Sequence, residues 1–134
     1  MTILAASYCP AHAAAVIARV DIKAQQMRVS IDGVEQAVWP VSTAGAHART
    51  PHGTFHPQWT AKQHRSSIYG DLMPYTVNYD GAYAVHGVDP TKDEERLLGH
   101  PASNGCVRIS DEHAKQFLEW TRANGLKNVT IIIN

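Results

Sequence analysis

The stretch YTVNYDGAYAVH, residues 75–86, contains two runs of strand-forming residues on either side of Asp80-Gly81. Asp-Gly is a preferred pair for the two-residue turn of a β-hairpin. Such a turn sets a register in which three pairs of residues face each other across the strands: Tyr79 and Ala82, Val77 and Ala84, and Tyr75 and His86. The stretch therefore predicts a hairpin that holds a histidine rigidly at the end of a strand.

The residues upstream of this hairpin also predict β-structure. Residues 16–23 and 26–31 have the pattern of strands, and Asp32-Gly33 predicts another hairpin turn. This turn brings apolar residues opposite each other in two pairs: Ile31 with Val34, and Met27 with Val38. Downstream we expect two further segments. The first is a strand at 53–61, with an edge position or a bulge because of Pro57, and the second is a polar loop at 62–71 that can carry part of a substrate cleft.

The C-terminal part of the chain predicts one helix followed by one strand. Ser110 is a good N-cap, and Gly125 is suited to the C-terminal end of the helix. Apolar and small residues recur at helical spacing and are expected to face the core: Ala114, Phe117, Leu118 and Thr121. Residues 129–133 are apolar on both faces, which indicates a central strand.

The composition limits the classes of function. A chain of 134 residues forms one domain and can bury a core without disulfides or a metal. Equal numbers of acidic and basic residues, 12 of each, give zero formal charge, and the basic residues are not clustered. We therefore expect no binding to nucleic acid or to an anionic membrane surface. No stretch approaches the roughly 20 apolar residues of a membrane span.

The residues with the clearest reactive chemistry lie in SNGCVR, residues 103–108. Cys106 is a candidate nucleophile, and a thiol with the usual pKa of roughly 8.5 needs a nearby imidazole or fixed positive charge to form a thiolate. His86 and Arg108 are the candidates for these roles. Gly105 permits an unusual backbone conformation, and backbone N–H groups of the loop, that of Cys106 included, can stabilise an oxyanion. From residue content alone, a buried and inert cysteine is the more common outcome.

His86-Gly87 followed by residues 103–108 resembles the signature of the L,D-transpeptidase family, also called the YkuD domain. That signature is a His-Gly pair followed, after a spacer, by Ser/Thr-His-Gly-Cys-hydrophobic-Arg/Asn. Other stretches resemble the family in the same order: Val20-Asp21-Ile22 with Gln25-Gln26, residues 40–45, residues 49–55, and Met73-Pro74-Tyr75. The resemblance covers residues 16–134 and implies a mainly β fold, a β-sandwich with a C-terminal helix packed on it. Residues 1–15 are left as an N-terminal segment, either a signal-peptide remnant or an extension.

The resemblance also implies roles for single residues. Cys106 is the expected nucleophile and His86 the base. The remaining roles are an oxyanion loop of Ser103, Asn104 and Gly105, and substrate contacts from Arg108, Gly87 and Tyr75. For Arg108 a buried position that braces the catalytic loop is an equal alternative to holding a substrate carboxylate. One position departs from the family, because Asn104 stands where a second histidine is usual, and an asparagine cannot take up a proton at neutral pH. His86 is then the expected base, with His100 as a less favoured substitute.

The resemblance implies an activity on peptidoglycan and leaves three functions open. In the first, Cys106 attacks a peptidoglycan stem tetrapeptide, releases D-alanine, and passes the acyl group to a neighbouring stem as a 3-3 cross-link. In the second, water or a free D-amino acid resolves the same thioester, which gives a carboxypeptidase, an exchange enzyme or a hydrolase. In the third, the domain binds peptidoglycan without catalysis, and Asn104 marks lost chemistry.

The remaining expectations concern cofactors, partners and location. We expect no cofactor and no metal, because the four-residue spacing of His52 and His56 suits a metal only on a helix, which the neighbouring prolines and glycine oppose. A monomer is expected that acts on stem peptides outside the cytoplasm, in the periplasm or cell wall, and so serves cell-wall biogenesis and cell shape. The alanine-rich start of the chain has no basic residue before its apolar run, so the export route stays open, and Cys9 is expected to be free.

Overall fold

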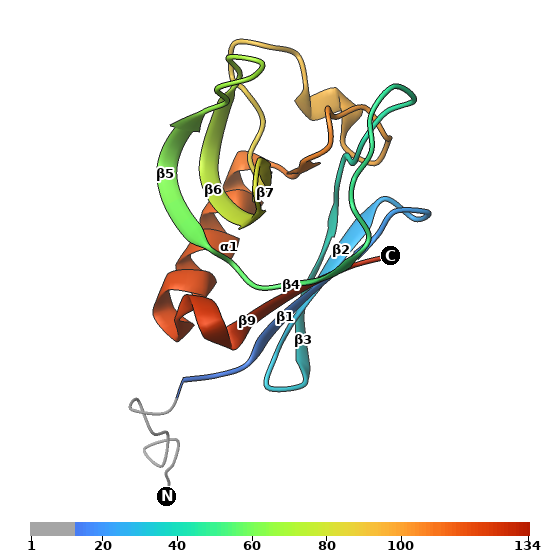
Figure 1. The fold of residues 1–134 in the computed structure, drawn as a ribbon. Helices are drawn as coiled ribbons and strands as arrows, with labels where there is room; N and C mark the ends of the chain where they lie inside the picture. Colours follow the sequence, from blue (N-terminus) through green and yellow to red (C-terminus); the bar gives the residue numbers. More distant parts are fainter. Residues whose placement is uncertain (1–12) are drawn as a thin grey trace, which may run out of the picture.

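The structure is a computed structural model that describes residues 13–134, and these form two β-sheets and one α-helix (Figure 1). The strands are β1 Val16–Asp21, β2 Gln26–Ile31, β3 Val34–Pro40, β4 Gly53–Phe55, β5 Trp59–Arg65, β6 Leu72–Asp80, β7 Tyr83–His86, β8 Val107–Arg108 and β9 Val129–Ile133. The helix α1 spans Asp111–Asn124, and two short 3-10 helices span Glu95–Leu97 and Leu126–Asn128. The predicted mainly β fold with a C-terminal helix is confirmed.

Strand order divides the chain into a larger and a smaller sheet. The five-stranded sheet has the order β3-β2-β1-β9-β4, and the four-stranded sheet has the order β5-β6-β7-β8. Neighbouring strands are antiparallel except for two pairs, β1 with β9 and β7 with β8. The strand at residues 129–133 lies inside the larger sheet, as its apolar sequence predicts, because β1 covers one edge and β4 the other.

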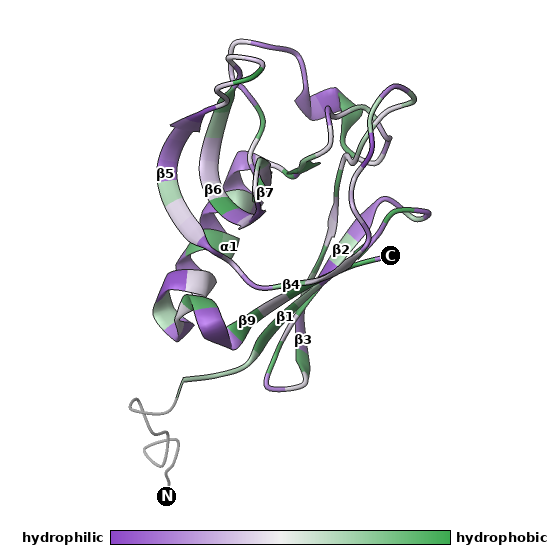
Figure 2. Ribbon diagram, in the orientation of Figure 1, coloured by the Kyte–Doolittle hydropathy of each residue, from purple (hydrophilic) through white to green (hydrophobic). Residues whose placement is uncertain are grey.

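Both sheets and the helix contribute to one core. Fully buried valines and isoleucines of β1 and β9 pack in the same cluster as side chains of β6, β7 and α1, among them Val77, Tyr79 and Phe117. The helix packs chiefly on β6. Figure 2 shows that α1 carries both hydrophobic and hydrophilic residues, as expected for a helix with one buried face.

The limits of α1 agree with the sequence. The Ser110 hydroxyl accepts a hydrogen bond from the His113 N–H at 3.2 Å, which caps the first turn. Gly125, with φ of +86°, ends the helix in a conformation that other residues rarely adopt. The residues expected to face the core are all buried: Ala114, Phe117, Leu118 and Thr121.

Each predicted hairpin contains a β-bulge that the sequence pattern did not reveal. In the first hairpin Ile31 faces Val34 as predicted, but the register then shifts and Met27 faces Trp39 instead of Val38. The shift turns Trp39 into the core, at 8% exposure, and leaves Val38 39% exposed. An inserted residue reverses the faces of a strand, and here it buries the larger side chain.

The second hairpin turns one residue later than predicted. The turn residues are Gly81 and Ala82, with Gly81 at φ of +55°, and Asp80 faces Tyr83. An irregularity between Asn78 and Asp80 then places Val77 opposite Val85 instead of Ala84. The predicted pairing of Tyr75 with His86 is therefore wrong, and the N–H of the next residue, Gly87, donates to the Pro74 carbonyl at 2.7 Å.

The segment around Pro57 also differs from the prediction. The expected strand at 53–61 is two strands, β4 in the larger sheet and β5 in the smaller sheet. The expected loop at 62–71 is strand as far as Arg65. Proline has no N–H for a sheet ladder, so the chain leaves one sheet at this point and enters the other.

The N-terminal end of the described region is attached to the domain by two hydrogen bonds. Ala14 donates its N–H to the Asn124 side chain at 3.0 Å, and Ala15 donates to Asp32 at 2.9 Å, so the chain is attached to the domain just before β1. Residues 1–12, with Cys9, lie outside the described residues, and most of the predicted N-terminal segment falls there. Within residues 13–134, no helix is long and apolar enough to span a membrane.

Candidate active site

The pairing of β7 with β8 brings three candidate residues to one face of the smaller sheet. Val85 faces Val107, and both are fully buried in the core. Because successive side chains of a strand point to opposite faces, the next pair, His86 and Arg108, points away from the core. Cys106 lies two residues before Arg108 and so shares its face. A two-residue periodicity thus places a thiol, an imidazole and a guanidinium together.

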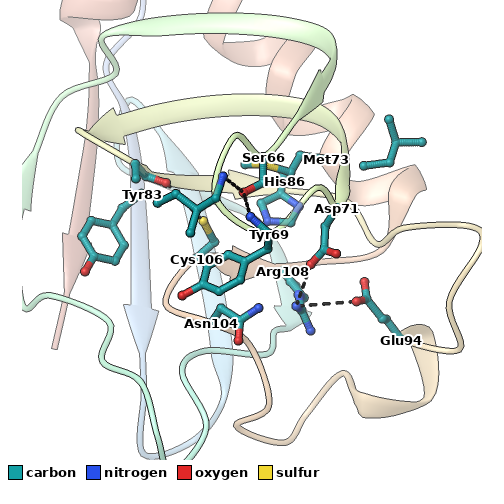
Figure 3. Close-up of a pocket in the computed structure, with 13 residues that line it drawn as sticks. Ser66, Tyr69, Asp71, Met73, Tyr83, His86, Glu94, Asn104, Cys106 and Arg108 are labelled. Atoms are coloured by element: carbon teal, nitrogen blue, oxygen red, sulfur yellow. Dashed lines mark hydrogen bonds and ion pairs between the residues drawn. The ribbon is translucent and has the colours of Figure 1, made fainter.

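These three side chains line a single pocket, shown in Figure 3. Its walls come from the β5–β6 turn, the start of β6, β7, the segment after β7 and the cysteine loop. The lining residues are Ser66, Ile68, Tyr69, Asp71, Leu72, Met73, Ala82, Tyr83, His86, Glu94, Asn104, Cys106 and Arg108. Ile68 and Tyr69 are 66% and 58% exposed, so the rim of the pocket is apolar and accessible.

The hydrogen bond of His86 defines its tautomer. Its Nδ1 lies 2.5 Å from the carbonyl oxygen of Gly87. A carbonyl only accepts, so Nδ1 carries the proton and Nε2 keeps its lone pair in the neutral ring. Burial lowers the pKa of His86 from 6.5 to about 4, opposed by the Gly87 hydrogen bond and reinforced by the Arg108 charge. The imidazole is therefore neutral at physiological pH, with a free basic nitrogen.

Cys106 is a half-buried free thiol directed toward the β6–β7 turn. Its Sγ donates to the Ala82 carbonyl at 3.6 Å. Burial raises the pKa of the thiol above its usual value, while the Ala84 N–H and the charge of Arg108 act in the opposite direction. The pocket thus holds a thiol whose pKa is raised and an imidazole with a free basic nitrogen.

The loop that precedes Cys106 is held in one conformation by its own side chains. The Ser103 hydroxyl donates to the Cys106 carbonyl at 2.6 Å and accepts from the Gly105 N–H at 3.0 Å. Gly105 has φ of +132°, and a Cβ at this position would lie 2.8 Å from the Tyr83 ring. A glycine is therefore required here both by backbone conformation and by space. The Gly105 N–H expected to face an oxyanion is already bonded.

A second layer of contacts supports this loop from the β1–β2 turn and from the segment between β3 and β4. Thr50 accepts from the Ala44 N–H at 2.9 Å and donates to the Gly105 carbonyl at 2.8 Å. The buried Gln25 side chain bonds both the hydroxyl and the N–H of Thr43. The Thr43 carbonyl in turn accepts the N–H groups of residues 102 and 103. Stretches far apart in the sequence thus meet behind the cysteine loop.

Arg108 is buried and paired with two carboxylates. Its Nη2 lies 3.5 Å from Glu94 Oε2 and 3.9 Å from Asp71 Oδ2. Asp71 also forms an ion pair with Lys92 at the edge of the pocket. Glu94 is held by the Asp89 N–H, which donates to Glu94 Oε1 at 3.0 Å. This network joins the start of β6, the segment after β7 and β8 around one positive charge.

Several predicted site residues lie elsewhere. Tyr75 and Gly87 do not line the pocket, and Tyr75 packs instead against the core. His100 is exposed and also lies outside the lining residues. His56 Nδ1 bonds the Val129 carbonyl at 2.8 Å, and residues 13–134 contain no cluster of three or more potential metal ligands.

The acidic side of the pocket was not predicted from the sequence. Asp71 comes from the segment that was predicted as a polar loop, Glu94 from a charged segment after β7, and Tyr83 from a predicted strand. No local sequence signal marks them, because their roles arise from the approach of segments more than ten residues apart in the chain. An aspartate in a polar loop is as a rule solvated.

Comparison with known proteins defines the class of this domain. The family model of the L,D-transpeptidase catalytic domain, YkuD, matches residues 15–133. The chain therefore belongs to the L,D-transpeptidase catalytic domain family, as its motifs predicted. None of the curated proteins matches it.

Solved structures of the family have the same fold. An L,D-transpeptidase from Mycobacterium smegmatis is 22% identical with a TM-score of 0.78, over 90% of this chain and 59% of the other. One from Mycobacterium tuberculosis H37Rv is 25% identical with a TM-score of 0.76, over 90% and 58%. L,D-transpeptidase 3 from Mycobacterium tuberculosis, in complex with a faropenem-derived adduct, is 23% identical with a TM-score of 0.73, over 90% and 60%. The chain thus spans somewhat under two thirds of the length of these relatives.

Proposed function

We propose that this domain is a cysteine L,D-transpeptidase that acts on peptidoglycan stem tetrapeptides through a thioester on Cys106. The observation that carries the proposal is the hydrogen bond from His86 Nδ1 to the Gly87 carbonyl, in a pocket shared with the free thiol. This bond leaves Nε2 as a base for the thiol. A purely structural role for His86 would not explain why a basic ring nitrogen is left unpaired in the same pocket as a free cysteine.

The proposed reaction begins with a neutral pair. Sγ attacks the carbonyl of the L-centre of meso-diaminopimelate while its proton passes to His86 Nε2. The tetrahedral oxyanion is stabilised by the Cys106 N–H and by the Asn104 side-chain amide, since the Gly105 N–H is bonded to Ser103. His86 then returns the proton to the departing amine of D-alanine, and a thioester remains. An amine of a second stem then attacks the thioester, His86 Nε2 takes up the amine proton and passes it to Sγ as the C–S bond breaks, and the 3-3 cross-link forms with the thiol of Cys106 regenerated.

Arg108 has a positioning role in this proposal. Its two carboxylate partners leave little positive charge for a substrate carboxylate, and it lies beside His86 in the sheet register. We assign it to fixing the pocket walls and to lowering the pKa of the thiol. Peptidoglycan lies outside the cytoplasm, so the proposal also places the domain in the periplasm or cell wall, with a role in wall biogenesis and cell shape.

Product analysis with a purified disaccharide-tetrapeptide tests the proposal. The wild type should release D-alanine and form a cross-linked dimer, and Cys106→Ala should leave the substrate intact. Tripeptide without dimer would show that water resolves the thioester, and a D-amino acid incorporated at the same position would show exchange. An unchanged substrate with both proteins would favour the non-catalytic binding domain.

A further inference from the structure

The peptide group between Gly87 and Val88 links the histidine of the site to an aspartate that the mechanism above does not use. Its carbonyl oxygen lies 2.5 Å from His86 Nδ1, and its N–H donates to Asp111 Oδ1 at 2.8 Å. The C=O and N–H of one trans peptide point in opposite directions. The imidazole and the carboxylate therefore sit on opposite sides of one peptide unit and are joined by two hydrogen bonds through it.

We infer that Asp111 is a positioning residue for His86, and that it acts through the Gly87–Val88 peptide to hold the tautomer that the thiol requires. A carboxylate that accepts the N–H polarises the peptide and makes its carbonyl a stronger acceptor for Nδ1–H. The inference rests on the proposed role of His86 as the base for Cys106.

The hydrogen bonds of the backbone around His86 show that Asp111 is the side chain that can orient the Gly87–Val88 peptide. The His86 carbonyl accepts the Ile109 N–H at 2.9 Å, and the Gly87 N–H donates to Pro74 at 2.7 Å. Both of these bonds are made by backbone groups. The next N–H, that of Val88, is held by a side chain, so the orientation of this peptide depends on the identity of residue 111.

The packing of Gly87 supports the same conclusion. A Cβ on Gly87 would lie 2.2 Å from Asp111 Oδ1 and 3.2 Å from the Asp111 Cα. Nothing larger than glycine fits between the strand end and the first turn of α1 while Asp111 keeps its bond. The glycine after the histidine is thus explained by the close approach of this carboxylate, although it does not line the pocket.

The position of Asp111 in α1 makes the arrangement specific. It is the first residue of the helix, next to the Ser110 cap, and its carboxylate bonds the Val88 N–H of another segment. Its neighbour Glu112 is also acidic and lies in the same first turn, but is exposed. Glu112 therefore shares the interaction with the helix dipole and lacks the contact with the peptide, which makes it a matched control.

The test combines an activity measurement with a spectroscopic one. Asp111→Ala should lower the rate of adduct formation with faropenem roughly tenfold, the lower end of the scale found when the group that orients a metal-bound histidine is removed. Asp111→Asn keeps an acceptor oxygen without the charge and should fall between Asp111→Ala and the wild type. Glu112→Gln should stay within about twofold of the wild type. Urea unfolding of each variant gives the folded fraction used to correct the rates.

The second measurement is the 15N spectrum of the histidine side chains, with the His86 signals assigned from His86→Gln. The wild type should show the Nδ1–H tautomer, and Asp111→Ala should populate the Nε2–H form. A loss of stability alone would not produce this change. All spectra are taken at the same pH of 7.5. The charged groups that face the two residues are present in the wild type and in every variant: Arg108 and Asp71 near His86, and Glu95 and Asp89 near Asp111. His64, which also faces His86, is monitored in the same spectrum.

The inference is overturned if Asp111→Ala keeps the Nδ1–H tautomer and reacts within twofold of the wild type. It is also overturned if Glu112→Gln has the same effect as Asp111→Ala. Failure of the proposed function would look different, since the wild type itself would then form no adduct. In that case the histidine spectra of the same variants still decide whether Asp111 holds the ring.

Discussion

The buried imidazole of His86 should make the stability of this domain depend on pH in a defined window. Burial lowers the pKa of His86 from 6.5 to about 4. Between these two values the unfolded chain binds a proton at this residue and the folded protein does not. Stability therefore rises with pH through the window, is fully present above pH 6.5, and is lost as the pH falls toward 4.

The size of the effect follows from the two pKa values. A tenfold change in proton binding is worth about 1.4 kcal/mol, so the full shift corresponds to about 3 kcal/mol. Between pH 7 and pH 5, His86 alone should reduce the free energy of unfolding by about 2 kcal/mol. His86 is 5% exposed, so solvent screens this contribution little. Asp89, whose hydrogen bonds to Thr91 help to lower its pKa to about 2, acts in a more acidic window.

Urea unfolding at half-unit steps from pH 4.5 to pH 7.5 measures the effect. His86→Gln cannot take up a proton, so the difference between wild type and variant isolates this residue from the other histidines and the carboxylates. The difference should change by about 2 kcal/mol between pH 7 and pH 5. Parallel curves for the two proteins would refute the reasoning, because they would show that His86 titrates alike in the folded and unfolded chain.

Three further substitutions test the packing around the site. Gly105→Ala should cost about 1–3 kcal/mol of stability and slow acylation, because φ is +132° and the added Cβ would meet the Tyr83 ring. Gly99→Ala is the control, because Gly99 also has a positive φ, +95°, but has open space around it. Arg108→Met should cost about 3 kcal/mol in urea unfolding, because Glu94 loses its ion pair and Asp71 keeps only the one with Lys92, and a loss below about 0.5 kcal/mol would contradict the ion-pair network. Phe117→Ala, at a fully buried position, should cost about 3–5 kcal/mol, and a smaller loss than that of Gly99→Ala would show that the core is wrongly described.

Much of the fold could be predicted because its signals are local. Ser110, Gly125 and the helical spacing between them define α1 within a residue, since caps act on neighbouring N–H and C=O groups. The hairpin turns at Asp32-Gly33 and near Gly81 also follow from short-range preferences of glycine. The registers beyond these turns could not be predicted, because each bulge depends on which side chain the other sheet and the helix accept. Trp39 is buried in place of Val38 for this reason.

The site residues also fall into two groups, those that local sequence signals predict and those that only the folded chain brings together. Cys106 and His86 share a motif, and the alternation of strand residues is enough to place them on one face with Arg108. Glu94 and Asp111 were missed as site residues because nothing in their own segments marks them. As the first residue of α1, Asp111 has a position where a carboxylate favours the helix dipole, and this alone gives no reason to assign it to the site. Its second role exists because the end of β7 passes this helix at a distance that only glycine allows.

The most direct test of the central claim is to locate the acyl group on the protein. The wild type is mixed with a disaccharide-tetrapeptide or with faropenem, quenched in acid, digested and analysed by mass spectrometry, alongside Cys106→Ala and His86→Gln. The account predicts an adduct on the peptide that carries Cys106, none with Cys106→Ala, and slow formation with His86→Gln. No adduct with the wild type, or an adduct on another residue, would contradict it.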